Sequence, residues 1–459
     1  MSSKPRIKPA DAEDGRPVSI SARLGRLQFH YSGKFRVLQI ADIQDGPKVS
    51  KDTITLIEAS LDATRPDLVI FSGNQIAGYD PAFADSFRKR RWCNEPIAES
   101  ALNHTRALVR KAIGQFTEPL AARGIPWAVT YGNHDFQCGI LADEQDDLYR
   151  EFAGCMNPVA GSSPLALEPG TFALPIEASD GSGRITMSVM MVNSGDYADT
   201  ADAGDGNGRQ SVTEYAKYAA NSRGWDLADS DGYGTPSPEA VEWLKRVQRE
   251  LGRRNGDGQA VPAIAFQHIP PQEFYDCLRE VPAYTPNAVE GAREFAGHCY
   301  VLDRDVCRPG SRLGEAIGCA DVNVGEVDAL REAGGYFALF CGHDHKNSFV
   351  GHVHDIDLGY APTCGFECYG PKSRFRGIRL FEFREDNPMA YVTRMLTWGD
   401  LVGRYSSNEL RVFFEDHCVT DLIGIRNELR RPQVFATLIG VGSMGLAALA
   451  HATLKLFRR

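Results

Sequence analysis

Apolar runs that end in polar or glycine-rich residues recur along this chain and alternate with helical patterns. Helical spacing predicts helices at 51–63, 100–120 and 238–251. Apolar runs predict strands at 35–41, 67–73, 127–135, 185–195, 263–270 and 336–345. Buried strands that alternate with helices are typical of parallel βαβ units, so the pattern predicts an α/β fold.

The alternation changes at three places. Residues 194–234 are rich in Gly, Asp and Ser and predict a long surface loop. Residues 276–332 interrupt the strand and helix pattern and are interpreted as an insertion. After residue 345 the runs FVGHVHDIDLGY and GIRLFEFR alternate apolar and polar positions, which favours an antiparallel edge or a second sheet.

These patterns suggest a domain organisation. Residues 1–32 are charged and carry no apolar run, so they are predicted to be a flexible lead-in without a secretory signal. Residues 33–385 form the predicted domain with its insertion, and 386–431 a C-terminal extension.

The end of the chain has a different composition. Residues 434–454 carry no formal charge over 21 positions, a length that matches a hydrocarbon core of about 30 Å. The alternative is a buried amphipathic helix, but an all-round apolar, glycine-rich segment favours a transmembrane anchor. We therefore expect a membrane protein with a single C-terminal span. Without a signal peptide, the large domain is expected on the cytoplasmic side.

Composition excludes several classes of function. The net charge of −10 comes without a window of Lys and Arg interleaved with aromatics, so nucleic acid is not an expected partner. The 11 cysteines form no CxxC pair, which argues against a zinc ribbon or a disulfide framework.

Polar residues gather where five predicted strands end. The strand ends read ADIQDG, FSGNQI, YGNHD, FQHIP and FCGHDH. Carboxyl ends of parallel strands meet at one edge of a sheet, where open α/β sheets form their ligand sites. One histidine there would be ordinary, but five coincident strand ends predict a site. Its candidate residues are Asp42, Gln44, Asn74, Asn133, His134, His268, His343 and His345.

The candidate ligands are oxygen and imidazole groups without thiolate, which suits Mn, Fe or Zn as divalent ions. Two such ions about 3.5–4 Å apart would clamp a phosphate and supply a hydroxide for in-line attack. A nearby histidine that is not a ligand could protonate the leaving alkoxide.

In order and spacing, these motifs resemble those of the calcineurin-like metallophosphoesterase superfamily: DxH, GD, GNH, a lone His and GHxH. YGNHD, FQHIPPQEF, CGHDHKN and CGFECYG resemble its small purple acid phosphatase-like branch. The resemblance covers roughly residues 33–385. It implies a four-layer α/β/β/α sandwich that uses divalent metals to hydrolyse a phosphomonoester or phosphodiester.

The resemblance also assigns roles. It implies that Asn133, His268 and His343 hold one metal, that Asp42 and His345 hold the other, and that His134 is the acid. Two positions depart from the family pattern. Gln44 stands where the family has a histidine, and Asn74 where it has the aspartate that bridges both metals.

Several compensations are open. Asn74 could bind through its carbonyl oxygen, although a neutral amide cannot offset two dications as a carboxylate does. Asp45 could replace a ligand, but capping of its turn is preferred. His352 or His354 could face the site, but solvent is preferred. Loss of the first metal, with one ion left, requires none of these movements.

Two hypotheses follow. The first is a membrane-anchored phosphoesterase with an atypical site of one or two divalent ions, which the retention of His134 favours. The alternative is a weakened pseudo-phosphatase that acts as a membrane-anchored binding scaffold, which the loss of the bridging carboxylate at Asn74 favours.

Overall fold

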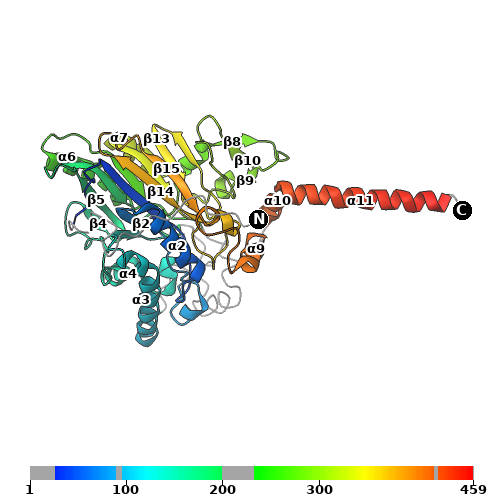
Figure 1. The fold of residues 1–459 in the computed structure, drawn as a ribbon, viewed down its shortest axis with the longest axis horizontal. Coiled ribbons are helices and arrows are strands. Elements are labelled where there is room, and N and C mark those ends of the chain that lie inside the picture. Colours follow the sequence, from blue (N-terminus) through cyan, green and yellow to red (C-terminus); the bar gives the residue numbers. More distant parts are fainter. Residues whose placement is uncertain (1–25, 89–95, 199–231, 418–421, 458–459) are drawn as a thin grey trace.

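The computed structural model describes residues 26–88, 96–198, 232–417 and 422–457, without the side chains of 422–423 and 447–457 (Figure 1). The rest of the predicted lead-in and most of the 194–234 loop lie outside this description. Leu27 and Phe29, within the predicted lead-in, are buried between the two sheets.

Two β-sheets form the centre of the fold. One has the order β15 (Val392–Thr397), β14 (Gly377–Arg384), β1 (Lys34–Ile40), β2 (Leu68–Ser72), β3 (Trp127–Thr130). The other has the order β12 (Val350–Val353), β13 (Ile356–Tyr360), β11 (Tyr336–Cys341), β7 (Ala263–Phe266), β6 (Ile185–Met191), β5 (Thr171–Glu177), β4 (Ala166–Glu168).

Helices cover the outer face of each sheet, and Figure 1 shows them on opposite sides of the molecule. The first sheet packs against α2 (Lys51–Thr64), α3 (Glu99–Ala121) and α4 (Ala142–Arg150). The second packs against α6 (Pro238–Asn255) and α7 (Glu326–Ala333). A third apolar core lies between the sheets and includes Phe35, Ile264 and Phe381. The chain therefore folds as an α/β/β/α sandwich.

The parallel strand pairs position the site. β1, β2 and β3 are parallel neighbours, as are β6, β7 and β11, and β11 and β13. Crossover helices connect them, so the carboxyl ends of β1, β2, β3, β7 and β11 point the same way within each sheet. The polar turns that the sequence places at these strand ends follow directly.

The interrupted region contains a sheet of its own. β8 (Leu278–Val281), β10 (Cys299–Leu302) and β9 (Val289–Glu290) form a three-stranded antiparallel sheet. The region predicted as an insertion also contains α7, which packs in the core beside α6. Its periodic apolar residues, such as Val327 and Leu330, belong to the sandwich.

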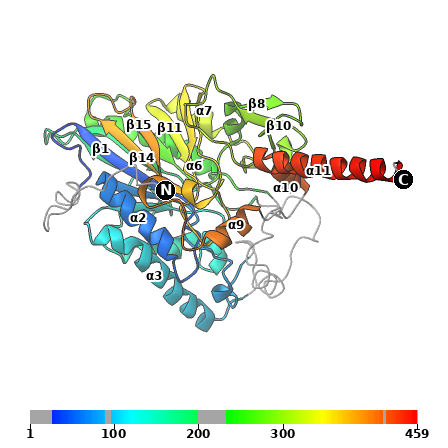
Figure 2. The same ribbon diagram turned by 45° about the vertical axis from the view of Figure 1, so that its right-hand side comes forward.

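The C-terminal extension contains α8 (Trp398–Leu401), α9 (Glu409–His417) and α10 (Leu422–Arg430), followed by α11 (Pro432–Phe457). Figures 1 and 2 show α11 extending away from the sheets. Within the described part of the chain, no helix is both long and apolar enough to cross a membrane. The transmembrane anchor predicted at 434–454 is therefore not supported. The prediction used all 21 uncharged positions from 434 to 454. The structure describes the side chains of α11 only as far as residue 446.

Candidate functional site

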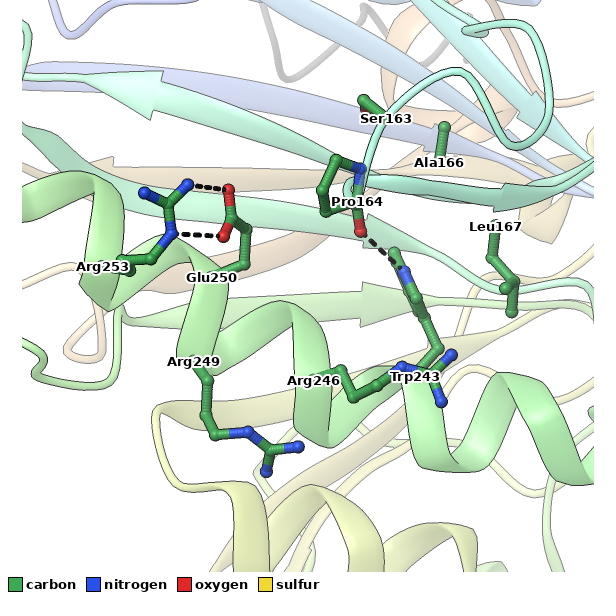
Figure 3. Close-up of a pocket in the computed structure, with 9 residues that line it drawn as sticks. All are labelled: Ser163, Pro164, Ala166, Leu167, Trp243, Arg246, Arg249, Glu250 and Arg253. Atoms are coloured by element: carbon green, nitrogen blue, oxygen red, sulfur yellow. Dashed lines mark hydrogen bonds and ion pairs between the residues drawn. The ribbon is translucent and has the colours of Figure 1, made fainter.

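Six of the eight candidate residues line a cleft of about 960 Å³ at the carboxyl ends of the strands, and the other two, Asp42 and His268, are buried. Its lining includes Gln44, Asn74, Asn133, His134, His343 and His345. A smaller hollow of about 380 Å³ lies between α6 and β4 (Figure 3). There the Trp243 indole donates to the Pro164 carbonyl at 3.0 Å, and Glu250 pairs with Arg253 at 2.7 Å. That hollow contains none of the candidate residues.

The backbone at the cleft is strained. The φ angles of Asp42, Gln44, Asn74 and His343 are 50°, 45°, 53° and 73°. Side chains with a Cβ rarely adopt this left-handed region, and such outliers cluster at functional sites. Asp42, Asn74 and His343 each stand two positions beyond β1, β2 or β11, and Gln44 stands four positions beyond β1. Gln44, Asn74 and His343 line the cleft.

Asp135 holds two of these turns together. Its carboxylate accepts from the backbone N–H groups of Gly132 (2.7 Å), Asn74 (2.8 Å) and Ile76 (3.0 Å). Burial raises the pKa of Asp135 to about 7, although these hydrogen bonds act against the rise. The fourth residue of GNHD therefore positions the loops after β2 and β3, a role that the sequence analysis did not assign.

Asp42 Oδ1 is buried and has no hydrogen-bond partner among the described residues. It lies 3.4 Å from His345 Nε2 and 3.8 Å from His268 Nε2. His345 Nδ1 donates to the Tyr369 carbonyl at 2.6 Å, which leaves Nε2 facing the carboxylate. Burial opposes a charge on His345, yet Cys368 and Asp42 raise its pKa. The space beside Asp42 therefore favours a positive charge.

His268 and Asn133 face each other with two acceptor atoms. His268 Nδ1 lies 3.0 Å from the Ser72 carbonyl, so Nδ1 carries the proton of the neutral ring. Burial lowers the pKa of His268 and favours that neutral ring. Its Nε2 lone pair then lies 3.1 Å from Asn133 Oδ1. Two lone pairs at this distance are best satisfied by a cation or a proton.

The Asn74 side chain points its amide nitrogen, not its carbonyl oxygen, towards the candidate ligands. Its Oδ1 accepts from the His134 backbone N–H at 2.9 Å. Its Nδ2 donates to Asn133 Oδ1 at 3.2 Å, so the group nearest the candidate ligands is a donor. Reversing the amide would set Nδ2 against the His134 N–H, donor to donor. Coordination through the Asn74 carbonyl, which the sequence left open, would therefore cost a buried hydrogen bond.

Asp45 does not supply the missing ligand, and Gln44 offers only a neutral amide oxygen. Gln44 Nε2 donates to the Tyr79 hydroxyl at 2.8 Å, while its buried Oε1 has no partner among the described residues. Asp45 Oδ2 accepts from Ser50 N (2.9 Å) and the Thr53 hydroxyl (3.0 Å) at the start of α2. Asp45 therefore caps the turn before α2, as the sequence preferred.

His134 stands in the cleft between two tyrosines. Its ring packs edge-on against Tyr79, with centroids 5.0 Å apart, and against Tyr197 at 6.4 Å. Nδ1 lies 2.8 Å from Gln137 Oε1, so Nδ1 is the protonated nitrogen. Burial lowers the pKa of His134 to about 3. In this arrangement the ring is neutral at pH 7 and carries no proton on Nε2 for a leaving group.

His343 packs edge-on against His268 and Tyr233, with centroids 5.1 and 4.3 Å apart. Burial lowers its pKa as well. His352 and His354 bond to Asp357 (2.9 Å) and Asp276 (2.7 Å) outside the cleft lining, so neither replaces a ligand.

The sequence analysis missed two other cleft residues, Tyr79 and Glu315. Tyr79 lies beyond the GNQI turn, and an isolated tyrosine in a turn gives no signal. Glu315 comes from the insertion and accepts from the Lys346 backbone N–H at 2.8 Å. Burial raises the pKa of Glu315. No motif connects residue 315 with the GHDH turn.

The sequence model of the calcineurin-like phosphoesterase family matches residues 35–347. This chain belongs to that family. The match begins in β1 and ends just after the GHDH turn, so it includes all the candidate residues.

Its relatives are purple acid phosphatase-like proteins. Probable inactive purple acid phosphatase 29 of Arabidopsis thaliana is 22% identical over 392 residues, covering 79% of this chain and 80% of the relative. Probable inactive purple acid phosphatase 28 of the same plant is 25% identical over 390 residues, covering 78% and 77%. A dimetal phosphatase from Danio rerio of known structure aligns with 79% of this chain and 98% of its own at 13% identity, with a TM-score of 0.41.

Members of this family use divalent metals, and the cleft fits one cation better than two. The unpartnered Asp42 Oδ1 and the facing lone pairs of His268 and Asn133 suit a single positive charge. At the bridging position, Asn74 presents an N–H donor. The residues therefore do not fit a bridged pair of metals. Throughout the described residues, no three His, Cys, Asp or Glu side chains are grouped so that they could hold a metal ion.

Proposed function

We propose that this family member binds phosphoesters in the cleft beside a single divalent ion and has lost the two-ion hydrolysis of its family. The observation that carries the proposal is the orientation of Asn74, whose amide donates towards Asn133 where a bridging carboxylate would accept. The pseudo-phosphatase alternative thereby becomes the preferred function.

The charge balance supports one ion. Asp42 is the only carboxylate among the seven candidate ligands that the sequence assigns, the others being Gln44, Asn74, Asn133, His268, His343 and His345. Two dications would bring four positive charges against one negative charge. At about 4 Å the Coulomb repulsion between two dications is roughly 16 kcal/mol, even at an effective dielectric constant near 20.

The residues of the cleft have separate tasks in this proposal. A bound divalent ion would supply positive charge to the phosphoryl oxygens. Asp42, His345, His268 and Asn133 would hold that ion. His134, with its proton on Nδ1 and towards Gln137, accepts a hydrogen bond from Asn133 Nδ2 at its unprotonated Nε2 (3.3 Å) and does not donate to a leaving group.

Hydrolysis with a single ion is a second candidate function. The presence of His134 in the lining of the cleft favours this candidate, because a histidine at this position of the GNH motif is the acid that the family resemblance implies. A bound ion would add positive charge beside the ring. Catalysis would then require a proton on Nε2.

Turnover and binding measured on the full chain separate the two candidates. p-Nitrophenyl phosphate and bis(p-nitrophenyl) phosphate are offered with Mn, Fe or Zn, and binding of inorganic phosphate is measured by calorimetry. We expect phosphate binding without turnover, and turnover that appears only in the Gln44→His plus Asn74→Asp variant. His354→Gln, outside the cleft, is the matched control.

Three results would change the assignment. Wild-type turnover that His134→Gln abolishes would establish single-ion hydrolysis and overturn the binding role. Wild-type turnover that survives His134→Gln would overturn both candidates. Failure to bind phosphate with any of the metals would also overturn both.

A further inference from the structure

The outer part of the cleft contains several charged side chains, and its carboxylates are neutralised within the protein. Asp416 binds Lys346 at 3.3 Å and Arg431 at 3.0 Å. Glu367 is paired with Arg411. Negative charge in this part of the cleft is therefore already offset by neighbouring cations.

Two arginines in the same lining have no such partner in the part of the chain that the structure describes. Arg312 belongs to the insertion, and Arg374 lies in the turn before β14. Their guanidinium carbons lie 3.6 and 4.4 Å from the centroid of the Phe375 ring. Neither side chain makes an ion pair or a hydrogen bond with any residue that the structure describes. Partial burial, and then the nearby Arg374, lower the pKa of Arg312.

Two further cations extend this group. Among the described residues, Lys372 Nζ donates to one neutral oxygen, Gln433 Oε1, at 3.2 Å and to no carboxylate. Arg430 Nη1 is buried without a hydrogen-bond partner among the described residues. Both line the cleft with the arginine pair. Four cations that pair with no carboxylate of the described residues are unexpected in a chain with 60 acidic and 50 basic residues.

Arg376, on the same loop, shows what a structural arginine looks like here. Its guanidinium is buried and donates to the carbonyls of Gly365, Cys368 (3.0 Å) and Pro371 (3.1 Å). Each of its three nitrogens donates to a backbone carbonyl oxygen. Arg312 and Arg374 differ because their donors remain available, while Phe375 keeps two like charges close together.

We propose that Arg312 and Arg374, with Lys372 and Arg430, form a second anion subsite, so that the cleft takes an organic phosphate with two anionic groups, such as a bisphosphate. This inference rests on the proposed function, in which the first phosphate lies beside Asp42 and the histidines. The second phosphate would bind the guanidinium groups, whose planar forks match phosphate oxygens.

Binding of paired probes tests the subsite. Butyl phosphate and octyl phosphate are compared by calorimetry with butane-1,4-diyl and octane-1,8-diyl bisphosphate, on the full chain with Mn. A bidentate Arg–phosphate contact is worth at least about 1.4 kcal/mol, or tenfold. We therefore expect at least one bisphosphate to bind about tenfold tighter than its monophosphate.

The variants locate that gain. Arg312→Gln plus Arg374→Gln is expected to reduce the advantage of the bisphosphate to less than about twofold, because the second phosphate loses both guanidinium partners. Monophosphate binding should stay unchanged, because neither arginine contacts the first phosphate. The matched control is Arg246→Gln plus Arg249→Gln in the smaller hollow beside α6 (Figure 3). It removes the same charge and should preserve the advantage.

The possible failures are distinct. Monophosphate binding without any gain for either bisphosphate would overturn the subsite and leave the proposed function standing. A gain that survives the Arg312 and Arg374 variant would also overturn the subsite. Arginine-dependent bisphosphate binding without monophosphate binding would support the subsite and overturn the first phosphate site. No binding of any probe would overturn both.

Discussion

Replacing Asn74 by Asp converts a donor into an acceptor at the centre of the cleft. Asn74 Nδ2 donates to Asn133 Oδ1 at 3.2 Å, and in the variant two oxygens would face each other there. The loss of the hydrogen bond costs about 1 kcal/mol. If burial raises the pKa of the new carboxyl group by about 2 units, burial of its ionised form adds roughly 2.7 kcal/mol near neutral pH. We expect a loss of about 3–4 kcal/mol in the free energy of unfolding without metal.

A divalent ion should reverse most of this loss, because the new carboxylate would be a ligand. An ion at about 100 times its Kd stabilises by about 2.7 kcal/mol if it binds only the folded state. The assay is urea unfolding in EDTA and in excess Mn, with Asn387→Asp as an exposed control. An Asn74→Asp variant as stable as wild type in EDTA, or one that Mn does not stabilise, would refute the hydrogen-bond assignment.

Two other changes test the supports of the site and the fold. Asp135→Ala leaves three backbone N–H groups without their acceptor and should cost at least about 3 kcal/mol in urea unfolding. Replacing the exposed Asp143 by Ala should change the free energy of unfolding little. Equal losses of stability in the two variants would contradict the role of Asp135 in holding the two turns together. Burial raises the pKa of Glu326 to about 8, so its contribution to stability is present below about pH 4.5 and lost as the pH rises through 8. Glu326→Gln should gain stability relative to wild type between these limits, and an unchanged difference at pH 5 and pH 8 would contradict this assignment.

The strand ends of the site could be predicted because they follow from local pattern and sheet geometry. Five apolar runs end in polar turns, and parallel strands bring those turns to one edge. The strand β5 was not predicted, since Pro175 interrupts its alternation of apolar and polar positions. The core helix α7 was included in the insertion because it is short and follows a long irregular stretch.

The direction of the Asn74 amide could not be predicted. It is set by the His134 backbone N–H, which lies 60 residues further along the chain. The packing of α9 against the cleft depends in the same way on the pairing of Asp416 with Lys346, 70 residues apart in sequence. Neither contact has a local signal. The C-terminal anchor was predicted from composition alone, and the described helices do not support it.

Metal stoichiometry tests the central claim most directly. The full chain and the Gln44→His plus Asn74→Asp variant are saturated with Mn or Zn, freed of excess metal, and measured by elemental analysis against protein concentration. The orientation of Asn74 predicts at most one ion per chain in the wild type and two in the variant. Two ions per wild-type chain would contradict the account, because the cleft would then hold a dinuclear centre without a bridging carboxylate.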